Sequence, residues 1–205
     1  ACAPYRRLSL CNKNLKNINN DDSSKAKNDL LLDVCYAAKY EGESITLNYP
    51  KYEAIYEGSG HTPCTMLARS FADIGDIVRG RDLYRGGGRG KGKEKLEKNL
   101  KEIFGDIYEE LSNNGVKERY KDDEDKNFYQ LREDWWTENR ETVWKAITCD
   151  EENKLGGYSY FRGTCGDEEK KSTLARDKCR CPKGDQVPTY FDYVPQYLRW
   201  FEEWA

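Results

Sequence analysis

The chain has 205 residues, a formal net charge of −3 and 35% charged residues, which suits one medium-sized domain. Aliphatic side chains are few, but the chain contains 15 Tyr, 6 Phe, 5 Trp and 8 Cys. Aromatic side chains bury large areas and disulfides restrict the unfolded chain, so we exclude a disordered chain. The longest apolar run, 34–38, excludes a membrane-spanning helix. Because the sequence shows no starting Met and no signal peptide, we expect a fragment of a larger polypeptide.

The first predicted elements are a loop, a helix and an irregular segment. Residues 1–22 are Asn-rich and predict a loop, and 23–40 predict a helix that Gly42 would end. Residues 43–61 mix Tyr, Pro and Gly, which favours irregular structure. The next helix, 62–80, opens with Thr at the N-cap and Pro in its first turn, and shows an apolar stripe at helical spacing.

The second half alternates helices with long loops. Residues 85–93 predict a flexible basic loop, and helices are expected at 94–111, 128–149 and 195–205. Residues 150–192 are rich in Gly, Lys and Cys and predict an irregular stretch that disulfides must order. Five helices and no convincing strand indicate a mostly α fold, namely a disulfide-stapled helical bundle with long irregular loops.

Tryptophans are concentrated on two of these helices, and we interpret them mainly as core residues. Trp135 and Trp136 are adjacent, so both cannot face one core, and we expect one of them at a subdomain boundary. Trp200 and Trp204 lie one helical turn apart on the last helix.

The cysteines favour disulfides over metal binding. An even number of eight is typical of an oxidising, extracellular compartment. A nominal zinc set exists around His61, but structural zinc sites use paired C-x2–4-C elements, which this sequence lacks. We therefore expect no metal and no cofactor. The eight residues are Cys2, Cys11, Cys35, Cys64, Cys149, Cys165, Cys179 and Cys181.

The sequence contains no convincing catalytic site. His61 is the only histidine and lies in a Gly- and Pro-rich turn, where an ordinary loop role is the simpler interpretation. Residues 87–93 match the opening of a phosphate-binding loop, but Glu94 stands where Ser or Thr should hold magnesium, and a helix precedes the loop. We expect that the chain is not an enzyme.

Positive charge is concentrated between residues 79 and 101, where nine basic residues meet three acidic ones. This density favours a polyanion site, and outside the cell sulfated glycans are the available polyanions. Two alternatives remain: the charge only keeps a Gly-rich loop soluble, or the RGG-like tract binds single-stranded nucleic acid. The candidate residues are Arg79, Arg81, Arg85, Arg89, Lys91, Lys93, Lys95, Lys98 and Lys101.

Five ordered segments carry a family resemblance: ACAPYRRLSLC (1–11), AAKYEG (37–42), LARSFADIGDIVRGRDLY (67–84), LREDWWTENRETVWKAITC (131–149) and DYVPQYLRWFEEWA (192–205). Together they resemble the Duffy-binding-like domain, and more narrowly its alpha class in the variant erythrocyte membrane adhesins of Plasmodium falciparum. The resemblance implies a cysteine-rich helical fold of three subdomains. Residues 1–61 would be the end of the first subdomain with a connecting helix, 62–205 the second subdomain, and the third would be absent.

The resemblance also implies a function without catalysis. Such domains are displayed on the infected erythrocyte as part of a larger membrane-anchored protein, and they bind host receptors in rosetting and cytoadherence. The implied partners are heparan-sulfate-like glycans, blood-group sugars, complement receptor and antibodies; nucleic acid and direct membrane insertion are not implied. Four cysteines between residues 77 and 197 weaken the rosetting assignment, because the subset of the family linked to rosetting more often has two. The alternative is a structural spacer and antigenically variable decoy beside a receptor-binding module.

At least three disulfides are expected to join helix ends to the stretch 150–192. The resemblance and the positions make Cys149–Cys165 the most natural local pair. The other implied pairs are Cys35 and Cys64 with Cys179 and Cys181 in either order, and Cys2 with Cys11 or with partners upstream.

Overall fold

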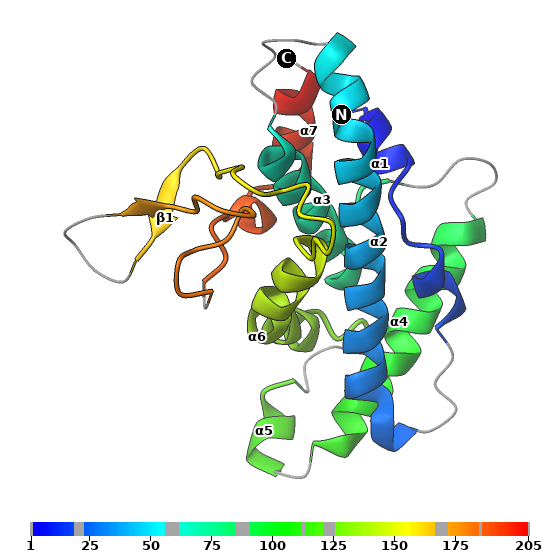
Figure 1. Ribbon diagram of the computed structural model, residues 1–205. Coiled ribbons are helices and arrows are strands. Elements are labelled where there is room, and N and C mark those ends of the chain that lie inside the picture. The colour runs from blue at the N-terminus through cyan, green and yellow to red at the C-terminus, as the bar shows by residue number, and fades with distance from the viewer. Residues whose placement is uncertain are drawn as a thin grey trace.

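The computed structural model describes residues 2–18, 23–55, 62–84, 91–111, 114–120, 126–166, 172–184 and 186–204. It confirms a mostly helical fold, in which several helices gather around one long central helix (Figure 1). The α-helices are α1 (Tyr5–Leu8), α2 (Ala26–Ile55), α3 (Pro63–Val78), α4 (Lys91–Glu110), α5 (Asn114–Glu118), α6 (Tyr129–Ile147) and α7 (Gln196–Trp204). The remaining elements are the 3-10 helices η1 (Asn14–Asn17), η2 (Ser23–Lys25) and η3 (Phe191–Tyr193), and the strands β1 (Gly163–Cys165) and β2 (Thr173–Leu174).

The central helix α2 corrects the expected stop at Gly42 and the irregular segment after it. The helix continues through Gly42 and contains Pro50 in its interior. Ile45 and Tyr49 follow Gly42 at helical spacing and are buried, so packing extends the helix beyond the glycine. Gly42 itself faces the backbone of Ile147 at the crossing with α6.

Helix α3 matches the prediction and forms the middle of the core. The side chain of Thr62 accepts a hydrogen bond from the Thr65 amide, and Pro63 occupies the first turn. All residues of α3 except Met66 are buried, because α2, α6, α7 and η3 pack around it. The predicted stripe from Leu67 to Val78 therefore lies inside the bundle.

The adjacent tryptophans of α6 reach two neighbouring helices. Trp135 meets Phe104 of α4 edge-on at 6.1 Å between ring centroids, and Trp136 lies 5.0 Å from Phe71 of α3. Both are buried. Both rings nevertheless belong to one hydrophobic core. This corrects the expectation that one core could not hold both, because neighbouring helices pack against α6 on two sides. Trp200 is buried, whereas Trp204 is exposed.

The stretch after α6 is irregular as expected, apart from a short antiparallel hairpin of β1 and β2. Two disulfides order it. Cys64–Cys179 joins the start of α3 to this stretch, and Cys165–Cys181 joins the last residue of β1 to the segment that follows β2. The first agrees with one of the two expected orders.

The other pairings expected within this chain are wrong, whereas upstream partners for Cys2 and Cys11 stay a prediction. Cys165 is bonded to Cys181 and not to Cys149, because β1 carries Cys165 away with the hairpin while Cys149 stays beside Lys39 of α2. All eight cysteines lie among the described residues, where they form two disulfides and not the three expected. The free cysteines are Cys2, Cys11, Cys35 and Cys149. Among the residues described, none of the helices combines the length and the apolar character needed to cross a membrane.

Candidate polyanion-binding surface

Arg79 is not part of the predicted basic surface. Its exposure is only 1%, and its guanidinium donates to the Gly75 and Asp192 carbonyl oxygens and to the Asp76 carboxylate. Glu133 lies 3.5 Å from another of its nitrogens. This corrects the sequence interpretation: Arg79 ends α3 and fastens it to η3 and α6, so its charge is used internally.

The exposed part of the basic stretch begins at Arg81 and continues on α4. Lys95 and Lys98 are exposed, Lys101 is half-buried, and Lys93 is half-buried near the start of α4. Lys98 has 75% of its side chain exposed, and its only described ion pair is a surface contact one turn along α4, so its charge remains accessible. Arg85 and Arg89 lie outside the described residues, and Lys91 begins α4 without a described side chain. His61 also lies outside the described residues.

A polar junction fixes the segment between α3 and α4. Lys93 Nζ donates to the Asp82 carbonyl oxygen at 2.6 Å. The carboxylate of Asp82 accepts from Arg7 of α1 and from the Gln196 side-chain amide of α7. Arg7 also lies over the ring of Tyr84, 4.7 Å from its centroid. Residues far apart in the sequence therefore hold the start of the basic surface in place.

Behind this surface, α3 presents two buried carboxylates to arginines of α1 and α7. Asp73 accepts from Arg6 at 2.7 Å and from Arg199 at 2.8 Å. Burial opposes its charge, but Arg6 and Arg199 outweigh burial and lower the pKa of Asp73. Burial dominates at Asp76 and raises its pKa to about 6, although Arg199 also binds it. These contacts are internal and stabilise the bundle.

The structure also contains a cavity that no sequence motif predicts. It has a volume of about 540 Å³ and lies between α1, α2, α3 and α7. Its charged lining residues are Arg6, Glu41, Arg69 and Glu203, of which Arg6 and Glu203 form an ion pair at 2.8 Å. Its aromatic residues are spread over the chain, so no local motif marks it. They are Tyr5, Tyr49, Tyr52 and Trp204. Rings and neutral polar groups of this kind suit contact with uncharged surfaces.

Comparison with known proteins identifies the same family in sequence and structure. The Duffy binding domain family matches residues 1–199. The Duffy receptor beta form of Plasmodium knowlesi is 26% identical over 212 residues, covering 100% of this chain and 14% of the receptor. The Duffy receptor of Plasmodium vivax (strain Salvador I) is 27% identical over 213 residues, covering 100% and 15%. The chain thus spans a small part of these curated relatives.

Solved structures give higher identities. The NTS-DBL1(alpha-1) domain of the Plasmodium falciparum membrane protein 1 from the varO strain is 42% identical with a TM-score of 0.77, over 100% of this chain and 43% of that chain. The PfEMP1 IT4var13 DBLbeta domain bound to ICAM-1 is 32% identical with a TM-score of 0.71, over 100% and 44%. This chain spans less than half of each solved chain.

Proposed function

The chain belongs to the Duffy binding domain family, and from this premise we propose that it is an extracellular host-cell adhesion module of a malaria variant surface antigen. The observation that carries the proposal is the family match over residues 1–199. A structurally similar DBLbeta domain is bound to ICAM-1, which supports a host surface receptor as the partner. On this proposal the chain is part of a membrane-anchored protein on the infected erythrocyte and binds erythrocytes or endothelium without catalysis.

We propose the family's division for this chain. Residues 1–61 would form the end of the first subdomain with its connecting helix, and 62–205 the second subdomain. Since α2 crosses α6 in one packed core, the two parts would act as one rigid unit here.

We also propose that sulfated, heparan-sulfate-like glycans contact the exposed basic surface. Lys95 and Lys98 support this, because they are exposed on one side of α4 and attract polyanions by charge. Arg79 is left out because it is buried. The proposed contact residues are Arg81, Arg85, Arg89, Lys91, Lys93, Lys95, Lys98 and Lys101.

Cell binding of the disulfide-intact chain tests the adhesion proposal. We expect the fluorescently labelled chain to bind human erythrocytes or endothelial cells in flow cytometry, and soluble heparin to compete. Absence of binding to both cell types would contradict adhesion and favour the spacer and decoy role.

Heparin chromatography tests the glycan part. Serine replacement of the loop cations should lower the salt concentration of elution, because fewer counterions are released on binding, while the circular dichroism stays unchanged. A matched control removes four lysines elsewhere, three of them exposed and one half-buried, and should elute later than the loop variant. The loop set is Arg85, Arg89, Lys91 and Lys93, and the control set is Lys27, Lys39, Lys145 and Lys154. Equal elution of the loop variant and the parent would move the glycan site away from this surface.

A further inference from the structure

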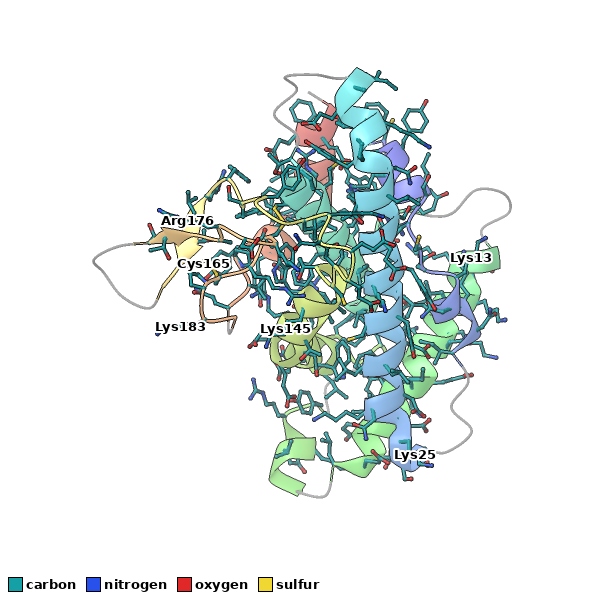
Figure 2. The ribbon with its side chains drawn as sticks, in the orientation of Figure 1. Lys13, Lys25, Lys145, Cys165, Arg176 and Lys183 are labelled. Atoms are coloured by element: carbon teal, nitrogen blue, oxygen red, sulfur yellow. A yellow bond between two sulfur atoms is a disulfide. The ribbon has the colours of Figure 1, made fainter. Side chains whose placement is uncertain are left out.

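A cleft of about 410 Å³ lies beside the basic stretch, between α1, η1 and the N-terminal end of α4. Its walls come from residues 7–16, from 82–84 and from 92–96, and the first of these segments is distant in the sequence from the other two. Figure 2 labels Lys13 on the segment that crosses the start of α4. Charge counting along the sequence does not reveal this juxtaposition, since Lys13 and Lys16 stand in an Asn-rich polar segment.

The cleft is strongly basic. Arg7, Lys13, Lys16 and Lys93 line it, and Asp82 is its only acidic lining residue. The charge of Asp82 is already paired with the guanidinium of Arg7. Three ammonium groups therefore remain for a ligand, and Lys93 has two further donors besides the one it gives to the Asp82 carbonyl oxygen.

The two N-terminal lysines are held in place by their backbone. Between them, Leu15 is fully buried in the core. The side-chain amide of Asn99 on α4 donates to the carbonyl oxygens of Lys16 and Ile18 at 3.2 and 3.4 Å. Within the described part of the chain, neither Lys13 nor Lys16 forms an ion pair with a carboxylate. Their backbone is fixed while their charges stay available, which limits the entropy lost on binding.

We propose that this cleft binds a sulfated saccharide unit of a glycan chain, with Lys13 and Lys16 as binding residues beside Lys93. The inference rests on the glycan part of the proposed function and relocates its centre from the Gly-rich loop to a composite cleft. Ser9 and Asn12 line the cleft as hydrogen-bonding groups, and Tyr84 and Leu96 line it as apolar surface for a sugar ring.

A repeating polyanion fits better than a single anionic group. Beyond the cleft, α4 continues with the exposed Lys95 and Lys98, so a sulfated chain leaving the cleft meets further positive charge. A sulfated tyrosine or a phosphate ester on a peptide would satisfy only the cleft itself.

The test uses a heparin-derived hexasaccharide and isothermal titration calorimetry on the disulfide-intact chain. We expect Lys13→Gln with Lys16→Gln to weaken binding at least tenfold and to lower the slope of log K against log salt by about 1 to 2, since about 0.7–0.9 counterions are released per phosphate in nucleic acids. Gln keeps much of each aliphatic stem, and unchanged circular dichroism verifies the fold. Lys13→Arg with Lys16→Arg should retain binding.

A matched control removes the same charge from the other side of the molecule. Lys145 and Lys183 lie there, far from Lys13 in Figure 2, and replacing both by Gln should weaken binding less than threefold. An equal loss in control and cleft variants would overturn the inference, because it would indicate general attraction. Parental affinity of the cleft variant would also overturn it, as would tighter binding of a sulfotyrosine peptide than of the hexasaccharide.

Failure of this inference is distinguishable from failure of adhesion. If the parent binds cells but neither parent nor variant binds the hexasaccharide, the cleft assignment is wrong and the adhesion proposal stands. If the parent binds the hexasaccharide through Lys13 and Lys16 but no host cell, the cleft is supported and adhesion is contradicted.

Discussion

Replacing Asp73 by alanine removes the most heavily used carboxylate of the core. Its side chain is fully buried and accepts hydrogen bonds from Arg6, Arg199, Gln196 and Trp200 at 2.7, 2.8, 3.1 and 3.3 Å. The substitution leaves these donors without their acceptor and buries guanidinium charge with less compensation. Breaking a buried ion pair from one side costs about 3–5 kcal/mol, a large part of the 5–15 kcal/mol typical of a whole domain.

Urea unfolding followed by far-UV circular dichroism measures this loss. We expect Asp73→Ala to lower the free energy of unfolding by about 3–5 kcal/mol, and Arg199→Met in the same chain to recover part of it by removing the uncompensated charge. The control is Glu141→Ala, which breaks the exposed pair with Lys145 and should cost less than about 0.5 kcal/mol. A loss below about 1 kcal/mol for Asp73→Ala would refute the view that this cluster holds α1 and α7 on α3.

Non-reducing peptide mapping should find the pairs Cys64–Cys179 and Cys165–Cys181. Replacing the first pair by Ser should cost about 5 kcal/mol and the second about 3 kcal/mol in the free energy of unfolding, because they close loops with sequence separations of 115 and 16; equal costs would contradict the loop-entropy argument. Burial raises the pKa of Asp76 from 3.8 to about 6, so between these values the folded chain holds a proton that the unfolded chain releases. Stability from this group should therefore fall as pH rises from 4 to 6. Urea unfolding across this range should show a weaker pH dependence for Asp76→Asn, and an unchanged dependence would count against the assignment.

The positions of helices could be predicted from the sequence where apolar residues recur at helical spacing and are buried. The stripe from Leu67 to Val78 defines α3 because each of its members is buried, and Thr62 marks its start by a real cap hydrogen bond. Disulfide pairing was predictable only in part, since it depends on how the chain folds back. Without the β1–β2 pairing, nothing along the sequence directs Cys165 to Cys181 and away from Cys149.

The basic stretch shows the limit of counting charges along a chain. Arg79 contributes as much to that count as Lys98, yet one is internal and the other has 75% of its side chain exposed. Burial distinguishes Arg79 from Lys98. Arg79 lies at the end of α3, where its guanidinium donates to the Asp76 carboxylate and to the Asp192 carbonyl oxygen. Lys13 and Lys16 are the opposite case, because charge counting leaves them out although they lie beside the basic stretch. The packing of η1 against α4 places them there, and no sequence motif marks them.

Gly42 illustrates an ambiguity that sequence periodicity cannot resolve, since a glycine that ends a helix and one that admits a close crossing look alike in sequence. A Cβ at Gly42 would lie 1.9 Å from the Ile147 carbonyl oxygen, a backbone atom that cannot move aside alone. Gly42→Ala should therefore separate α2 from α6.

The control for this substitution is Gly105→Ala on α4, where a Cβ would meet only the Phe128 ring at 3.7 Å. There the substitution should stabilise the chain by about 0.5–1 kcal/mol through helix propensity alone. At Gly42 the same gain is outweighed by overpacking, typically about 1–3 kcal/mol and more against rigid backbone, so the thermal midpoint should fall for one variant and rise for the other. A rise in both would mean that α2 and α6 cross less closely than the structure shows, and that Gly42 has no packing role.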